Sequence, residues 1–197
     1  MLDGELVSDT FHIFDLLRQN GNDCTKVPYV LRQEWTMRAF EHCHNERIRR
    51  VQSFFYRTQK SDAVRAFREA NAEGIILRDR NAPYFIGRTS ACLKYKFIER
   101  ATLLVDGHET DKRSVYLGGF DAMGKRITMG KVTIPPNFEV PPTDSIVEVE
   151  YLYAYPDTKA LFQPVYKGIR SDQTEAACVL SQLKYKNTRS EDDPVIA

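Results

Sequence analysis

Residues 73–78 read EGIILR, and residues 92–97 read CLKYKF. Both runs have the β-branched and aromatic composition of strands, and a loop containing Gly, Pro and Asn joins them. Lys94 and Lys96 are two residues apart, so on a strand their side chains project from the same face. This arrangement indicates either a surface that binds phosphates or a solvated strand edge that its lysines protect against aggregation.

A strand pair is expected at the start of the chain. LDGELV at residues 2–7 and FHIFDLL at residues 11–17 are two short apolar-rich runs. Asp9 and Thr10 lie between them, which is typical of two strands with a tight connection.

Two helices are predicted between this strand pair and residue 73. Over residues 30–46 a helical face is expected from the four-residue spacing of Leu31, Trp35, Ala39 and Cys43. Ser61 or Asp62 is expected to cap a second, shorter helix. The apolar stripe of that helix consists of Val64, Phe67 and Ala70. Residues 1–98 therefore form a domain in which strands and helices mix.

The second half of the chain has a different pattern. Five strand-like segments with turn signals between them are ATLLVDG (101–107), VYLGGFDA (115–122), ITMGKVTIP (127–135), SIVEVEYLYA (145–154) and ALFQPVYKG (160–168). Five short strands without a long helix favour an oligonucleotide/oligosaccharide-binding barrel. We therefore predict an α+β chain with a mixed domain over residues 1–98, a five-stranded barrel over residues 99–186 and a polar tail over residues 187–197.

Composition excludes several classes of protein. The 197 residues are 42% hydrophobic and 28% charged, and the net charge is +1, which excludes a disordered or collagenous chain. No apolar run approaches the roughly 20 residues that cross a bilayer, and MLDGELVSD carries acids where a signal peptide is basic. A cytoplasmic, nucleoid-associated or viral location is expected. The four cysteines form no CxxC pair, which argues against a disulfide framework and a zinc ribbon.

A basic segment lies in the first half. Between Arg38 and Arg68 there are eight Lys and Arg residues against three acids, with aromatic residues among them. The candidates for contact with nucleic acid are Arg47, Arg49, Arg50 and Arg57. Basic residues next to aromatic rings can bind phosphates and stack on bases, although a solvated helix and strand face has the same composition.

The order LDGELV, FHIFDLL, EGIILR, CLKYKF, followed by a five-stranded segment, resembles the covalent nucleotidyltransferases, and most closely the ATP-dependent DNA ligases. In that family a lysine attacks the α-phosphate of ATP, the AMP passes to a 5′-phosphate at a nick, and the 3′-hydroxyl displaces it. The resemblance implies ATP and Mg²⁺ as cofactors and nicked double-stranded DNA as partner. An RNA ligase or an mRNA capping guanylyltransferase within the same superfamily, and a non-catalytic nucleic-acid-binding remnant, stay open as alternatives.

By resemblance, each quoted string contributes a site residue. Glu5 contacts the ribose, Phe14 stacks on the adenine, and Glu73 binds the metal. Lys94 and Lys96 contact the phosphates. From the residues alone, Phe14 reads equally well as a core residue. For Glu73 the alternative is a solvated charge, which the EGIILR string disfavours.

A further candidate follows the last strand-like segment. Arg170 and Asp172 match the family segment that reaches the pyrophosphate of ATP, whereas Gln173 stands where a basic residue is common. From the residues alone, Arg170 is equally well a surface arginine on a loop.

The nucleophile string of the family, Lys-x-Asp-Gly, does not occur in the sequence. Its Asp-Gly pairs are Asp3-Gly4 and Asp106-Gly107, and the residues two positions before them are Met1 and Leu104. We therefore expect that the chain starts within the catalytic domain and that an upstream segment or a partner chain supplies the lysine. We also expect that the chain does not adenylate itself, because no covalent adenylate forms without that amine.

Overall fold

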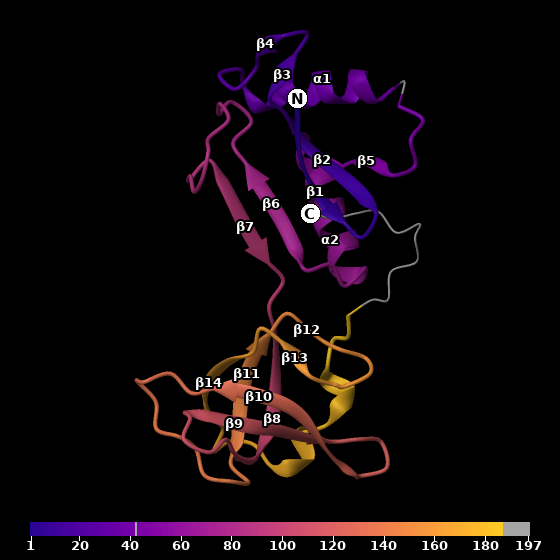
Figure 1. Cartoon of the computed structure of the whole chain (residues 1–197). Helices are drawn as coiled ribbons and strands as arrows, with labels where there is room; N and C mark the ends of the chain where they lie inside the picture. Colours follow the sequence, from indigo (N-terminus) through magenta and orange to yellow (C-terminus); the bar gives the residue numbers. More distant parts are fainter. Residues whose placement is uncertain (42, 187–197) are drawn as a thin grey trace. The chain divides into compact units, whose positions relative to one another are not determined.

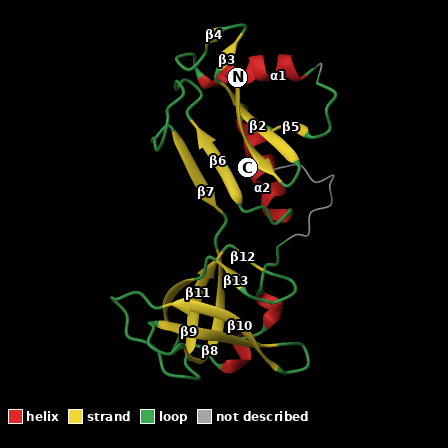
Figure 2. Cartoon of the chain, in the orientation of Figure 1, coloured by secondary structure: helices red, strands yellow, loops and turns green. Residues whose placement is uncertain are grey.

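The computed structural model describes residues 1–41 and 43–186, and these divide into two compact units (Figure 1). The first unit comprises Met1–Tyr95, and the second begins at Lys96. Strands dominate both units, and the α-helices of the described residues lie in the first (Figure 2). Within the described residues, no helix has the length and hydropathy that a bilayer crossing requires. The polar tail predicted at residues 187–197 lies outside the described part of the chain.

A three-stranded sheet with the order β1-β2-β5 begins the first unit. Its members are β1 (Leu2–Val7), β2 (Thr10–Leu16) and β5 (Ile48–Arg50). β1 and β2 are antiparallel, and Ser8 turns the chain between them with a φ of 53°. The strand pair predicted from the sequence is confirmed. A short ladder of β3 (Arg18–Gln19) and β4 (Asn22–Asp23) follows β2.

Helix α1 (Tyr29–Phe40) buries a polar face, so the apolar face predicted for it is wrong. Its buried residues are Arg32, Gln33 and Thr36, whereas Leu31 is 40% exposed. The helix also ends before Cys43. The physical reason is the surface that β2 offers, where the Asp15 carboxylate and the Phe14 carbonyl accept hydrogen bonds from the helix.

Helix α2 (Arg57–Glu69) begins earlier than predicted. Tyr56 is its N-cap, without a side-chain hydrogen bond, so Ser61 and Asp62 lie inside the helix. The Ser61 hydroxyl donates to the Arg57 carbonyl at 3.2 Å, and Asp62 pairs with Arg65 at 2.8 Å. Both side chains therefore have helical partners instead of capping the first turn. Of the predicted stripe, Val64 and Phe67 are half-buried and Ala70 is exposed.

Strands β6 (Gly74–Arg78) and β7 (Cys92–Lys96) form a two-stranded sheet, which confirms the two strands predicted from EGIILR and CLKYKF. The loop between them caps α1. The Tyr29 amide donates to the Ala82 carbonyl at 3.0 Å, and the Val30 amide donates to the Arg80 carbonyl at 2.9 Å. A distant loop thus supplies the acceptors that the helix N-terminus needs.

The second unit contains a five-stranded antiparallel sheet with the order β10-β9-β8-β11-β14. Its strands are β8 (Glu99–His108), β9 (Ser114–Phe120), β10 (Arg126–Thr133), β11 (Ile146–Tyr151) and β14 (Val165–Ile169). A two-stranded ladder of β12 (Tyr153–Ala154) and β13 (Leu161–Phe162) lies between β11 and β14 in sequence. Each of the last two predicted segments therefore holds two strands. Two short 3-10 helices, Glu175–Ala177 and Leu180–Gln182, follow β14.

The core of this unit follows the two-residue alternation of its strands. Val147, Val149 and Tyr151 of β11 are almost completely buried, and their neighbours in sequence are half-buried. The alternation changes phase after Tyr151, because β11 ends there and Leu152 and Ala154 are buried instead. The large buried cluster draws residues from all five strands of the sheet.

Candidate functional site

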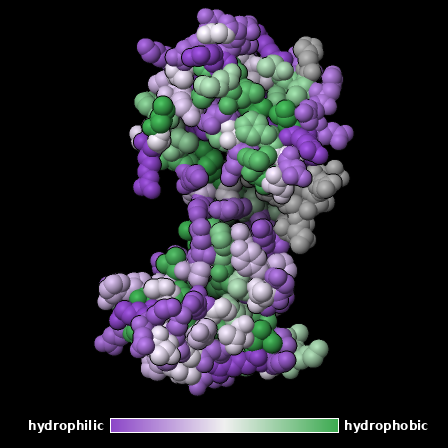
Figure 3. Space-filling model, viewed as in Figure 1, coloured by the Kyte–Doolittle hydropathy of each residue, from purple (hydrophilic) through white to green (hydrophobic). Residues whose placement is uncertain are grey.

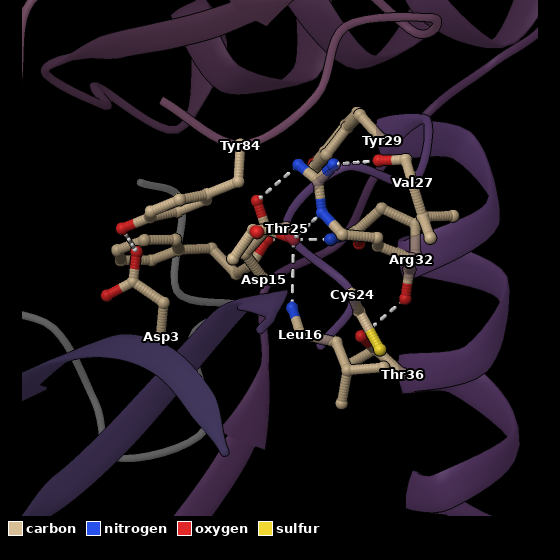
Figure 4. Close-up of polar contacts among 12 residues, drawn as sticks. Asp3, Asp15, Leu16, Cys24, Thr25, Val27, Tyr29, Arg32, Thr36 and Tyr84 are labelled. Atoms are coloured by element: carbon tan, nitrogen blue, oxygen red, sulfur yellow. Dashed lines mark hydrogen bonds and ion pairs between the residues drawn. The ribbon is translucent and has the colours of Figure 1, made fainter. Parts of the chain in front are cut away.

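A buried carboxylate of the first unit joins several of its elements (Figure 4). Asp15 of β2 has no exposed surface, and its oxygens accept two hydrogen bonds from Arg32, from Nε at 2.7 Å and Nη2 at 2.9 Å. Arg78 of β6 adds a third through Nη1 at 2.8 Å. The Leu16 amide donates to the same carboxylate at 2.8 Å. One carboxylate thus connects β2, α1 and β6 in a geometry fixed by charge-assisted hydrogen bonds.

Aromatic rings surround the second arginine of this cluster. The Arg78 guanidinium lies over the Phe14 ring at 5.3 Å and over the Tyr29 ring at 5.0 Å from the centroids. These distances allow cation–π attraction. Burial raises the pKa of the Tyr29 hydroxyl, so this ring stays neutral beside the arginines. Arg78, which belongs to the EGIILR string, therefore packs against one face of the Phe14 ring.

The backbone of Phe14 is held as well. Gln33 Nε2 donates to the Phe14 carbonyl at 2.6 Å, and Gln33 Oε1 accepts from the Ser53 hydroxyl at 3.1 Å. Ser53 lies 3.3 Å from the Tyr29 hydroxyl. The polar face of α1 thus fixes the strand that carries Phe14.

A cleft of about 210 Å³ adjoins the cluster. Asp3, Tyr29, Arg32, Arg78 and Tyr84 are among the residues that line it. The Tyr84 hydroxyl donates to Asp3 Oδ2 at 2.8 Å, and this hydrogen bond raises the pKa of Tyr84 (Figure 4). None of the site residues predicted from the sequence lines the cleft, and Phe14 is connected to it through Arg78.

Four of the residues predicted to bind ATP or the metal lie in the first unit. Glu5 is exposed on β1 opposite His12, and Phe14 is half-buried on the neighbouring β2. Glu73 is exposed directly before β6, and Lys94 is exposed on its partner strand β7. Glu5 and Phe14 thus lie on two hydrogen-bonded strands, whereas Glu73 directly precedes the strand that pairs with the one carrying Lys94.

Lys96 and Arg170 lie in the second unit, and both have protein partners there. Lys96 Nζ donates to Gln163 Oε1 at 2.8 Å. Arg170 pairs with Asp172 at 2.7 Å and with Glu148 at 2.8 Å. The Asp172 carboxylate raises the pKa of Arg170, and the arginine in turn lowers the pKa of Asp172.

The predicted basic segment does not form one face. Arg49 and Arg50 are consecutive on β5, so their side chains point to opposite sides of the sheet. Both are half-buried, and burial lowers the pKa of Arg50. Arg47 and Arg57 are exposed, outside β5 and at the start of α2 respectively.

Sequence reasoning missed the cluster of Asp15, Arg32 and Arg78. A signal was present in FHIFDLL, where an aspartate interrupts an otherwise apolar strand. A carboxylate in such a position requires a cationic partner. Among residues 1–41 and 43–186, no group of three or more His, Cys, Asp or Glu side chains forms a metal centre.

The segment that contains these strings matches a known protein family. Residues 2–96 match the family model described as ATP dependent DNA ligase domain. This segment belongs to the ATP-dependent DNA ligase domain family. A comparison with curated proteins gave no match.

Two solved structures share the fold of this chain. A structure described as DNA binding with a minimal scaffold, a structure-function analysis of Lig E DNA ligases, has a TM-score of 0.60 at 17% identity. The match covers 82% of this chain and 63% of the chain in that structure. A structure named Pmar-Lig_Pre has a TM-score of 0.61 at 19% identity and covers 84% of this chain and 45% of its own. This chain thus spans less than two thirds of both structures.

Proposed function

We propose that this chain takes part in the ATP-dependent sealing of nicks in double-stranded DNA, through lysyl-AMP and DNA-adenylate intermediates. One observation carries the proposal. The strings EGIILR and CLKYKF lie on β6 and β7, which pair with each other inside the segment that matches the ligase domain. Lys94 lies on β7, and Glu73 directly precedes the strand that pairs with β7, which supports a common role for the two side chains.

The role of each residue follows from its chemistry. Phe14 stacks on the adenine, and Arg78 holds its ring in place. Glu5, exposed on the adjacent strand, accepts hydrogen bonds from the ribose hydroxyls. Lys94 stabilises the negative charge on the phosphates as the bond between them breaks.

Lys96 and Arg170 bind phosphate only after each releases a protein partner. Each exchanges one partner for a phosphate oxygen when ATP binds: Lys96 leaves Gln163, and Arg170 leaves Asp172 but keeps Glu148. Both partners are exposed side chains, so the exchange takes place in solvent.

The residues present fit a magnesium ion that is held mainly by the nucleotide. Mg²⁺ is commonly bound by one or two carboxylates together with water and substrate phosphates, and Glu73 supplies one exposed carboxylate. When bound, Mg²⁺ neutralises charge on the phosphate oxygens.

We also propose that residues 1–98 act as the adenylation domain and that the sheet of residues 99–186 closes into a barrel. Support for closure comes from the single core that all five strands share. We propose that four arginines contact the DNA backbone at separate points, since the fold does not place them on one face. They are Arg47, Arg49, Arg50 and Arg57.

The test supplies a nucleophile lysine, because the sequence contains no Lys-x-Asp-Gly string. A Lys-x-Asp-Gly-containing segment of an ATP-dependent DNA ligase is fused ahead of Met1, and the fusion is incubated with α-labelled ATP, Mg²⁺ and a nicked duplex. We expect a labelled protein band that survives denaturation, followed by a sealed strand. Replacing the supplied lysine by alanine is the control, and it must abolish both products.

The chain alone is expected to form no covalent adenylate in the same assay, because the attacking amine is absent. Transfer of GMP instead of AMP, or sealing of RNA but not DNA, would favour the capping or RNA ligase alternatives. DNA binding by a fusion that neither adenylates nor seals would favour the non-catalytic alternative.

A further inference from the structure

The loop between β6 and β7, residues 79–91, presents two large apolar side chains to solvent. Ile86 is 96% exposed, and Phe85 is 49% exposed and also lines the cleft beside the Asp15 cluster. Gly87, with a φ of 88°, turns the chain directly after them. Apolar side chains reach the surface of this unit in Figure 3 as well. A tip of two adjacent exposed apolar residues is a feature that a binding partner explains.

The tip belongs to a loop whose base is firmly held. The Ala82 carbonyl accepts from the Tyr29 amide at 3.0 Å and from Arg32 Nη1 at 3.3 Å. The Tyr84 amide donates to the Thr25 carbonyl at 2.7 Å, and its hydroxyl donates to Asp3. The fold therefore presents Phe85 and Ile86 at a fixed position, so little ordering entropy is lost when a partner covers them.

The charges on the loop indicate the partner. Arg80 and Arg88 lie on either side of the tip, and both are exposed. The Asp79 carboxylate is engaged by its own loop, since it accepts from the Asn81 amide at 2.9 Å. Arginines that flank an apolar tip complement a phosphate backbone with a stack of bases between its strands.

We propose that this loop is a DNA contact in which Phe85 and Ile86 lie against the base pairs that border a nick, while Arg80 and Arg88 hold the flanking phosphates. A nick lacks one backbone linkage, so its base step opens more easily than a continuous step. An apolar wedge between base steps is a known way for a protein to hold such an opening. This inference rests on the proposed function, because it assumes that the nicked duplex is the ligand.

The experiment uses the full chain and a duplex with 2-aminopurine next to a single nick. Binding of the parent chain is expected to raise the 2-aminopurine fluorescence, since the base loses part of its stacking. The double variant Phe85→Ala/Ile86→Ala is expected to bind about tenfold more weakly and to leave the fluorescence unchanged. Arg88→Ala is expected to flatten the salt dependence of binding, by about 0.9 in the slope of log K against log salt.

Met123→Ala is the matched control, because Met123 is 94% exposed on a turn of the second unit. It is expected to bind as the parent does. If the double variant binds with parental affinity and parental fluorescence, the loop is not the contact. If the parent binds no nicked duplex, this inference fails as well. In both cases the adenylation and sealing assay on the fusion decides the proposed function separately. The same binding is measured with an intact duplex of the same sequence. If the double variant loses as much affinity for the intact duplex as for the nicked one, the loop does not contact the nick.

Discussion

At the scale of single residues, Asp15 is the position on which the first unit depends most. Its carboxylate and the Arg32 guanidinium are both almost fully buried, and Arg78 shares the carboxylate. Removing one partner of a buried ion pair leaves an uncompensated charge, so Asp15→Asn is expected to destabilise this unit by about 3–5 kcal/mol. The measurement is urea unfolding followed by the fluorescence of Trp35, the single tryptophan of the chain. Asp62→Asn breaks an ion pair with both partners about 70% exposed, and it should cost at most about 1 kcal/mol. Equal losses in the two variants would contradict the role of the cluster.

Cys178 is a second residue whose environment makes a measurable difference. It is fully buried, and burial raises the pKa of its thiol to about 11. At pH 8 its thiolate is scarce, so it should react with a thiol reagent far more slowly than the half-buried Cys92. Because the folded pKa is raised, this thiol contributes stability at neutral pH that is lost as the pH rises from about 9 towards 11. Mass spectrometry after timed labelling gives the two rates, and similar rates would contradict this account.

At the scale of elements, the buried polar face of α1 depends on hydrogen bonds to its neighbours. Gln33 has both ends of its amide engaged, by the Phe14 carbonyl and the Ser53 hydroxyl. Gln33→Leu leaves these groups without their partner and is expected to cost about 1–3 kcal/mol, although it adds an apolar residue to a buried position. Leu31→Gln lies on the exposed face and should change the stability by no more than about 0.5 kcal/mol. The same urea unfolding curves decide between this polar face and the apolar one that spacing predicts. If Leu31→Gln is the more harmful change, the apolar reading of α1 is right.

The strands were accessible to sequence reasoning because their signals are local. The two-residue alternation in β11 and the turn residues around β1, β2, β6 and β7 depend on neighbours along the chain. The buried face of α1 depends on a carboxylate of β2 and on a loop after β6, which no periodicity contains. The start of α2 was misplaced for a related reason. Tyr56 begins this helix without a side-chain cap, so a search for capping residues selects Ser61 or Asp62 instead.

At the scale of the whole molecule, the site was only partly accessible from the sequence. The strings that carry Glu5, Phe14, Glu73 and Lys94 identified the first unit, because such motifs are contiguous. The cluster of Asp15, Arg32 and Arg78 consists of residues far apart in sequence, and only the fold brings them together. The exchange of partners proposed for Lys96 and Arg170 likewise depends on contacts with Gln163 and Asp172 that the motifs do not encode.

The division into two units leads to the last prediction, that residues 96–197 fold without the first unit. Every member of the large buried core of the second unit lies between Ala101 and Leu183, so its apolar contacts are internal. Its sheet also pairs only with itself within the described residues. The isolated fragment should therefore show one cooperative thermal transition, at the temperature at which the second unit unfolds in the full chain. Both units expose large apolar side chains, such as Leu6 at 67% in the first and Met123 at 94% in the second, so both fragments should bind a hydrophobic dye. Circular dichroism and dye fluorescence on the two fragments give both answers. A fragment 96–197 without a cooperative transition would show that its core needs contacts from the first unit.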